Sequence, residues 1–299
     1  MALKKKLGKN CSVSDIVFTI INTLLMLFIA LIMVYPMYYV LVVSLSNSNM
    51  IAANSTLLLK PLGFTVDAYK AVIKNPGILS GYRNTLIILV GGLAVNLTLT
   101  AIGAYFFSRK NVKLQKPLWL FVLFTMYFSG GTIPFYFTVL DLGLKNSLLS
   151  LILPTAVSTF NMIILRNAFA SIPSDLEDAV KLDGGGHFVM LFRVILPLSK
   201  SAMAVMVMYY AVGHWNSWFN AMLFLDEREL FPLQLILREI LIVGDTQSMM
   251  EGAATVEAVS LSQSLKYAVI IVSTVPILLV YPFMQKYFVK GVMIGSVKG

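Results

Sequence analysis

The sequence predicts an all-α membrane protein with six transmembrane helices, and three observations support this fold class. Of its 299 residues, 58% are hydrophobic and only 12% are charged, whereas soluble domains carry roughly 25% charged residues. The mean hydropathy is +0.82. Six apolar segments also reach the length of about 20 residues that a helix needs to cross a bilayer. Disordered, disulfide-rich secreted and nucleic-acid-binding proteins are therefore excluded as first interpretations.

The predicted spans are residues 16–45, 80–108, 117–141, 147–170, 200–224 and 266–289. Lysines precede the first span as in a signal peptide, but its long apolar run lacks a small-residue cleavage site, so we expect a retained helix. The chain then comprises a tail of residues 1–15, a six-span domain of residues 16–291 and a second tail of residues 292–299. Asn22 and Asn96, each inside a span, are expected to form interhelical hydrogen bonds.

The distribution of basic residues predicts the orientation of the chain in the membrane. Fifteen of the 23 Lys and Arg residues fall on the side that holds both termini, and the side richer in these residues is cytoplasmic. Nine of the 14 acidic residues fall on the opposite side, mostly in two long outer loops of residues 46–79 and 225–265. The apolar stretch 230–237 in the second loop is too short to span, which favours an interfacial or re-entrant helix.

The segment 172–198, between the fourth and fifth spans, carries the most informative pattern. Ser174 can cap a helix N-terminus, and Glu177, three residues later, completes a capping-box pattern. Glycines 184–186 end this helix and permit a tight turn. A second amphipathic stretch runs to Leu196, and Pro197 marks its end or a kink. The first helix is expected to have an apolar side formed by Leu176, Ala179, Val180 and Leu182.

This segment resembles the EAA loop of permeases from ABC importers. The EAA pattern is approximately E-A-A, three residues, G, nine residues and I-x-L-P. This sequence has, at the corresponding positions, Asp178-Ala179-Val180, Gly184 and Val194-x-Leu196-Pro197. Within the E-A-A part of the pattern the chain departs at two positions, because Asp178 replaces Glu and Val180 replaces Ala.

The C-terminal residues 285–291 and 295–299 are similar to the carbohydrate-importer branch of this family. The resemblance extends over nearly the whole chain and is greatest to the maltose-type second permease subunit, within the complex-polysaccharide (LplC-like) group. It implies the type I ABC importer permease fold, in which residues 172–198 form a cytoplasmic coupling helix and its turn. The coupling residues that it assigns are Ser174, Glu177, Asp178, Ala179, Val180, Asp183, Gly184, Leu196 and Pro197.

The same resemblance implies the partners and the location of the chain. It implies a bacterial cell membrane, a second permease subunit, a cytoplasmic dimer of ATP-binding subunits, an extracytoplasmic solute-binding protein and a sugar or oligosaccharide substrate. No cofactor, metal or nucleic acid is expected, because ATP is bound by the partner. An importer for a non-sugar solute, and an intramembrane enzyme or membrane assembly factor, are the alternatives. The sequence lacks the G-x-x-x-x-G-K-[ST], H-E-x-x-H and G-x-S-x-G motifs, which disfavours an enzyme.

A cluster of polar and aromatic residues in the fifth span is the candidate substrate path. Amide and imidazole groups can bond sugar hydroxyls, while indole rings can stack on sugar faces. The candidates are His214, Trp215, Asn216, Trp218 and Asn220, together with Phe160 and Asn161 of the fourth span. The alternative is an aromatic belt at the outer membrane interface, where Trp is enriched.

Overall fold

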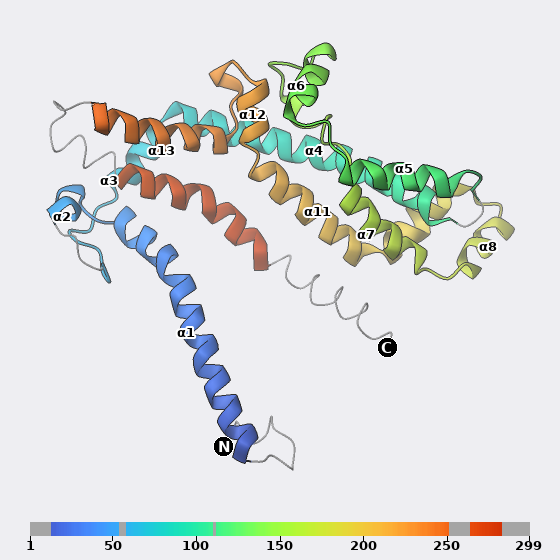
Figure 1. Ribbon diagram of the computed structural model, residues 1–299, viewed down its shortest axis with the longest axis horizontal. Helices are drawn as coiled ribbons and strands as arrows, with labels where there is room; N and C mark the ends of the chain where they lie inside the picture. Colours follow the sequence, from blue (N-terminus) through green and yellow to red (C-terminus); the bar gives the residue numbers. More distant parts are fainter. Residues whose placement is uncertain (1–12, 54–57, 110–111, 251–263, 283–299) are drawn as a thin grey trace. The chain divides into compact units, whose positions relative to one another are not determined.

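A computed structural model describes residues 13–53, 58–109, 112–250 and 264–282 (Figure 1). The regular elements in this part of the chain are all helices, which confirms the all-α prediction. The predicted tail 292–299 and most of the tail 1–15 lie outside the described residues. The chain divides into two compact units, Met1–Val72 with Ser248–Ile271, and Ile73–Gln247 with Val272–Gly299.

The first unit is built on α1, Val13–Ser44, a helix long and apolar enough to cross a membrane. This helix coincides with the predicted first span of residues 16–45, and Asn22 is exposed on it. Only the last residues of α1 are buried, where Val42 and Val43 pack with Leu58 and the partly buried Tyr267. The short helix α2, Ser48–Ala53, follows, and α3, Asp67–Lys74, closes the outer loop that the sequence predicts at 46–79.

The second unit is organised around α4, Pro76–Ser108, which coincides with the second predicted span and is long and apolar enough to cross a membrane. Asn75 begins the helix by accepting a hydrogen bond from the Gly77 N–H at 2.9 Å, and Pro76 occupies the first turn, where its missing N–H costs nothing. Helices α7, Thr159–Ala170, and α11, Lys200–Trp215, pack along α4 (Figure 1). These three helices position the segment 172–198 described below.

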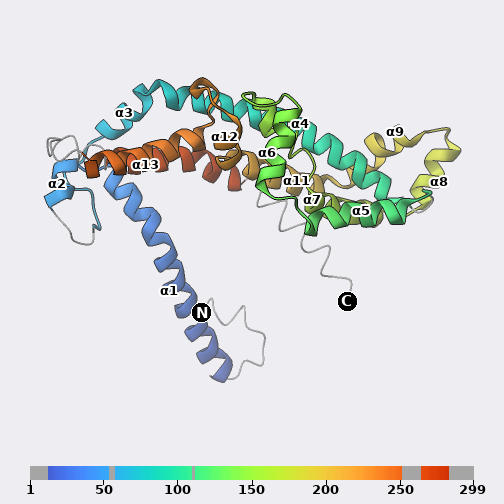
Figure 2. The same cartoon turned by 45° about the horizontal axis from the view of Figure 1, so that its top comes forward.

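Three predicted spans are interrupted, so the prediction of continuous helices there is wrong. Residues 117–141 form α5, Gln115–Tyr127, and α6, Thr132–Asp141, which diverge by 115° (Figure 2). Gly131, between them, has a φ of +85°, a conformation that glycine adopts without strain. Residues 147–170 form the short turn η2, Leu148–Leu151, and then α7. Residues 200–224 form α11 and a separate α12, Phe219–Phe224.

The second outer loop also contains regular structure. The short turn η4, Arg228–Leu230, leads into α13, Leu233–Met250, so the apolar stretch 230–237 contributes the first turns of an 18-residue helix. A last helix, Ser264–Pro282, corresponds to the sixth predicted span. Three described helices are therefore long and apolar enough to cross a membrane unbroken: α1, α4 and Ser264–Pro282.

Buried polar side chains of α4 hydrogen-bond to the backbone where the neighbouring spans are broken. Asn96 donates to the carbonyl oxygens of Thr155 and Ala156, at 3.1 and 2.9 Å, in the loop before α7. Tyr210 of α11 accepts from the Ser158 N–H at 3.0 Å in the same loop. Irregular backbone is tolerated at membrane depth only where the protein satisfies its polar groups. Asn96 also accepts a hydrogen bond from His214 of α11, so its predicted interhelical role is confirmed.

Side chains near the opposite end of α4 form hydrogen bonds to the backbone of the segment 225–265. Asn84 donates to the carbonyl oxygens of Glu229 and Phe231, at 2.6 and 3.1 Å, and Thr85 accepts from the Leu233 N–H at 2.9 Å. The first turn of α13 thus receives a hydrogen-bond partner from α4. Helix α4 is hydrogen-bonded along its length to segments that follow it by up to 190 residues, the longest separation being that between Tyr82 and the Val272 carbonyl.

Candidate functional site

The segment 172–198 forms the predicted pair of short helices. The first is α8, Asp175–Leu182, and it ends in a Schellman motif. Gly184 has a φ of +75° and donates to the Lys181 carbonyl at 3.0 Å, while Gly185 donates to the Val180 carbonyl at 2.8 Å. Both bonds satisfy carbonyl groups that a helix C-terminus leaves free. The C-cap residue is Asp183.

The three glycines 184–186 differ in what the structure requires of each position. Gly184 supplies the left-handed backbone conformation. At Gly185 a Cβ would lie 2.6 Å from Val180 Cγ1 and 3.0 Å from the Val180 carbonyl oxygen, so the turn is too close for a side chain. Gly186 is in an extended conformation, and no described heavy atom would lie within 4 Å of its Cβ. Sequence reasoning singled out Gly184 and missed the steric role of Gly185.

The expected apolar side of α8 is only partly buried. Val180 packs against the core cluster around Phe169 and Ile195, but Leu176 and Ala179 are exposed, and Leu182 is 89% exposed. Most of this apolar side is therefore exposed on the described chain. The exposed leucines point away from this subunit and are free to contact another protein.

The predicted capping box at Ser174 is also wrong. Ser174 occupies the N-cap position with a helical backbone, and within the described chain its hydroxyl makes no capping hydrogen bond. Glu177 instead forms ion pairs with Arg109 at 3.0 Å and with Lys181 at 3.2 Å. A local capping box was the simplest interpretation of S-x-x-E, but a partner 68 residues away binds the glutamate.

The surroundings of Glu177 keep it charged. Burial alone raises the pKa of this carboxyl, but hydrogen bonds from Lys181 and Arg109 outweigh burial and hold the pKa below its ordinary value. Because the pKa is lowered, the stabilising contribution of these pairs is present above the unfolded value and is lost as the pH falls through the lowered one. The pairs are therefore intact at neutral pH.

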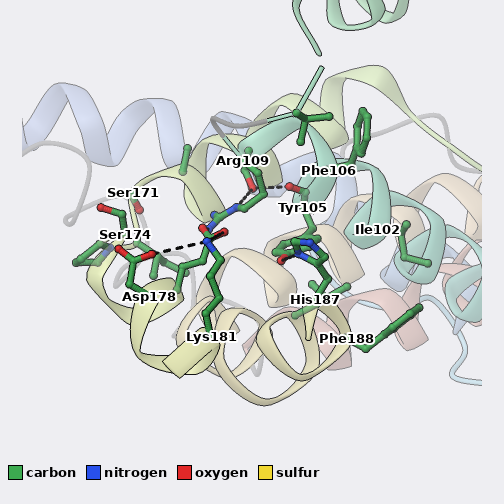
Figure 3. A pocket seen from close by; sticks show the side chains of 17 residues that line it. Ile102, Tyr105, Phe106, Arg109, Ser171, Ser174, Asp178, Lys181, His187 and Phe188 are labelled. Carbon is green, nitrogen blue, oxygen red and sulfur yellow. Dashed lines mark hydrogen bonds and ion pairs between the residues drawn. The ribbon is translucent and has the colours of Figure 1, made fainter. Parts of the chain in front are cut away.

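A groove of about 930 Å³ separates the end of α4 from the segment 172–198 (Figure 3). Arg109 and Lys181 approach one another from α4 and α8 on one side of it. On the other side, the Tyr105 hydroxyl and His187 Nδ1 are joined by a 2.9 Å hydrogen bond. Ile102, Phe106 and Phe188 give the groove an apolar end, and Phe188 is 76% exposed.

The second helix of the segment is continuous through α9, His187–Val189, η3, Met190–Ile195, and α10, Leu196–Leu198. The η3 turn is a π-helix, in which the Leu196 N–H donates to the Leu191 carbonyl. Such a widened turn occurs where a helix is locally disturbed, here just before Pro197, which has no N–H to donate. The helix ends at Leu198, one residue beyond the predicted proline, and α11 departs at 85°.

The candidate path residues do not gather around one cavity. His214 is buried and donates from Nε2 to Asn96 Oδ1 at 2.9 Å, while Trp215 donates to the Ser273 carbonyl at 3.3 Å. A Cβ at Gly92 would overlap the His214 ring, so this glycine makes room for the imidazole. Both predicted path residues therefore have structural partners.

The other path candidates are more open. Asn216 is exposed, Trp218 stacks under Arg238 with the guanidinium carbon 5.1 Å from the ring centre, and Phe160 contacts Tyr209 edge-on. Asn161 is buried at the first turn of α7. Asn220 lines a second cavity of about 460 Å³, beside the break between α5 and α6.

Comparison with known proteins identifies the family. Residues 117–294 match the family described as binding-protein-dependent transport system inner membrane component. The polygalacturonan/rhamnogalacturonan transport system permease protein YtcP of Bacillus subtilis (strain 168) is 40% identical over 279 residues, which cover 92% of this chain and 96% of that protein. The chain belongs to this family of transport permeases.

Other members agree with this permease assignment. Protein LplC of the same organism is 40% identical over 283 residues, 95% of each chain. A crystal structure of a bacterial ABC transporter involved in the import of the acidic polysaccharide alginate matches 94% of this chain and 100% of its own, with a TM-score of 0.84 and 30% identity. The resemblance to ABC importer permeases is confirmed. The enzyme alternative is set aside, because the relatives are transport permeases.

The missing capping bond leads to a prediction for this permease. Ser174→Ala is expected to leave uptake unchanged and to alter the free energy of unfolding by less than roughly 0.5 kcal/mol. Ser158→Ala is the matched control, because the Ser158 side chain accepts from the Asn161 N–H at the start of α7. Loss of that cap is expected to cost about 1 kcal/mol. Thermal denaturation in detergent measures the stability of both variants. An equal loss of stability in Ser174→Ala and Ser158→Ala would contradict the expected difference between the two serines.

Proposed function

We propose that this chain is one permease subunit of an ATP-driven importer for a sugar or oligosaccharide in a bacterial cell membrane. The names of its relatives support this substrate class, since YtcP is named for polygalacturonan and rhamnogalacturonan and the solved relative imports alginate. The six spans are α1, α4, α5 with α6, η2 with α7, α11 with α12, and Ser264–Pro282. Both termini lie in the cytoplasm, in accord with the distribution of Lys and Arg.

The chain works with a second permease subunit, two cytoplasmic ATP-binding subunits and an extracytoplasmic solute-binding protein. ATP binding closes the ATP-binding dimer and moves the segment 172–198, and the spans then open the path toward the docked binding protein. Hydrolysis resets the transporter. A rigid-body movement of this kind needs a short, firmly held element at the contact with the ATP-binding subunits.

The observation that carries this proposal is the two-sided character of the segment 172–198. Its inner side is held by Val180 and Glu177, whereas Leu182 and Phe188 are 89% and 76% exposed. Exposed apolar side chains that cluster on one element are typical of a protein interaction surface. We assign this surface to contact with the ATP-binding subunit, with Asp178 and Ala179 on the same exposed side.

The substrate path is assigned to the same residues as in the sequence interpretation, with Asn220 as the leading candidate. Its amide lines the cavity at the α5–α6 break together with Ser129, Thr132 and the ring of Phe135. Hydroxyl, amide and aromatic groups suit a saccharide. A non-sugar solute is the alternative, and uptake assays with neutral and uronate-containing oligosaccharides, against amino acids, discriminate between the two.

Leu182→Asp tests the proposed contact with the ATP-binding subunit. The side chain packs on almost nothing within its own subunit, so the variant is expected to fold and insert normally. A carboxylate placed in an apolar interface is costly, and we expect recovery of the ATP-binding subunit with the purified permease to fall at least roughly tenfold, which corresponds to 1.4 kcal/mol. Affinity purification in mild detergent with quantitative mass spectrometry measures it.

Leu59→Asp is the matched control, because Leu59 is 68% exposed in the opposite, outer loop. This variant should retain the ATP-binding subunit. Equal recovery of that subunit with Leu182→Asp and with the unaltered chain would contradict the proposed surface. Failure of the unaltered chain to recover any ATP-binding subunit would contradict the proposed function itself.

A further inference from the structure

We infer that Arg109 is a positioning residue that transmits the movement of the segment 172–198 directly to α4. This inference rests on the proposed function, and it adds a route that neither the EAA pattern nor the chain connectivity contains. Arg109 lies at the C-cap of α4 and is only 8% exposed. From the sequence, Arg109 was only one of the basic residues on the predicted cytoplasmic side.

The Arg109 guanidinium joins three elements of the second unit. Its Nη1 donates to Glu177 of α8 at 3.0 Å, and its Nη2 donates to the Phe169 carbonyl at the end of α7, also at 3.0 Å. Its Nε donates to Ser108 Oγ at 3.1 Å, and its carbon lies 5.3 Å from the centre of the Tyr105 ring. A planar fork with five donors suits such a set of contacts, which a lysine cannot reproduce.

A second contact fastens the other half of the segment to the same helix. The Tyr105 hydroxyl is hydrogen-bonded to His187, the first residue of α9. Both short helices of the segment are therefore attached to the last turn of α4, although α4 precedes them by about 70 to 80 residues. The attachments lie on either side of the glycine turn, so that α8 and α9 hold one orientation relative to α4.

The chain that leads from the segment 172–198 into α11 is bent, whereas Arg109 connects the segment directly to α4. The helix that begins at His187 meets α11 at 85° after a π-helical turn, so a push along it is not in line with α11. Helix α4, by contrast, is unbroken over 33 residues, about 50 Å at 1.5 Å per residue. Its far end holds η4 and α13 through Asn84 and Thr85.

The chemistry of the ion pair between Arg109 and Glu177 favours a positioning role over a purely stabilising one. Removing two charges from water offsets much of their attraction, so apolar residues of similar volume would stabilise this contact as well or better. A buried ion pair with several fixed donors does, however, define one geometry. Lys181 is 53% exposed and also binds Glu177, at 3.2 Å, and it helps to keep the carboxylate charged.

The test uses the complete transporter in proteoliposomes and measures substrate transported per ATP hydrolysed. Arg109→Met is expected to retain the ATP-binding subunits and their basal hydrolysis but to lower the transport ratio about tenfold, within the range for residues that modulate coupling. Arg109→Lys should recover little of the ratio, because lysine keeps the charge without the fork. The reversed pair, Arg109→Glu with Glu177→Arg, should transport better than either single variant.

Arg166→Met is the matched control. Arg166 lies at the same end of the unit, donates to the Phe107 carbonyl at 2.9 Å and stacks on Trp119, and these contacts all lie outside the segment 172–198. Its loss should leave the transport ratio unchanged. An unaltered ratio in Arg109→Met, or a loss of assembly and thermal stability in parallel with transport, would overturn the inference. Absence of ATP-binding subunits from the wild-type preparation would instead contradict the proposed function.

Discussion

A chain carrying Gly184→Pro is expected to reach the membrane in normal amounts and to transport almost nothing. Gly184 has a φ of +75°, whereas the proline ring fixes φ near −65°. Proline also removes the N–H that donates to the Lys181 carbonyl at 3.0 Å. A penalty of roughly 3 kcal/mol or more reduces the population of the native turn by roughly a hundredfold. Because the turn is on the surface, insertion should be unaffected.

Substrate uptake and membrane content, measured in the same cells, test this expectation. Gly186→Ala is the matched control, since its backbone is extended and its Cβ would face open space. Gly185→Ala should fall between the two, because the new methyl must displace Val180 by several tenths of an ångström. Equal uptake by the Gly184 and Gly186 variants would show that the shape of this turn is unimportant for transport.

The largest expected loss of stability follows from Asn96→Leu. The change removes the donors to the Thr155 and Ala156 carbonyls and the acceptor for His214. Each buried polar group left without a partner costs about 1–3 kcal/mol, although hydrogen bonds between membrane helices are often worth less. We expect a total loss of roughly 2–4 kcal/mol. The denaturation temperature in detergent should fall accordingly, by roughly 2–4 °C for each kcal/mol.

Thr98→Val provides the control on the same helix. Thr98 is exposed, and within the described residues its hydroxyl bonds only to the Ala94 carbonyl one turn earlier, so its replacement should leave the denaturation temperature nearly unchanged. A comparable drop in both variants would mean that any polar residue of α4 matters equally, and the role of Asn96 in holding the loop before α7 would be wrong.

Sequence alone predicted the long helices because their apolar runs are continuous. It failed at the breaks because apolar residues dominate on both sides of them. The signals were nevertheless visible, since Ser129-Gly130-Gly131 interrupts one predicted span and Pro154 with Ser158 precedes the start of α7. A hydropathy window averages over such residues, whereas the backbone responds to each one.

In the candidate coupling segment, too, features set by neighbouring residues could be predicted, whereas contacts with distant residues could not. The helix α8 and its glycine turn follow from adjacent residues, and both were predicted. The partner of Glu177 was not, because Arg109 lies 68 residues earlier and nothing in its surroundings distinguishes it from its basic neighbours. The structural partner of His214 was not predicted for a similar reason, since Asn96 lies 118 residues away.

The hydrogen bonds of α4 also constrain the order in which the chain can be completed during synthesis. Helix α4 emerges early, but its partners follow it by 60 residues at Asn96, 148 at Thr85 and 190 at Tyr82, which donates to the Val272 carbonyl. Until those segments are made, its polar side chains have no native partner in the lipid, where such exposure is unfavourable. Helix α4 is thus among the first segments to be inserted and among the last to reach its final contacts. A chain that stops before the last helix leaves the Tyr82 hydroxyl of α4 without its native partner.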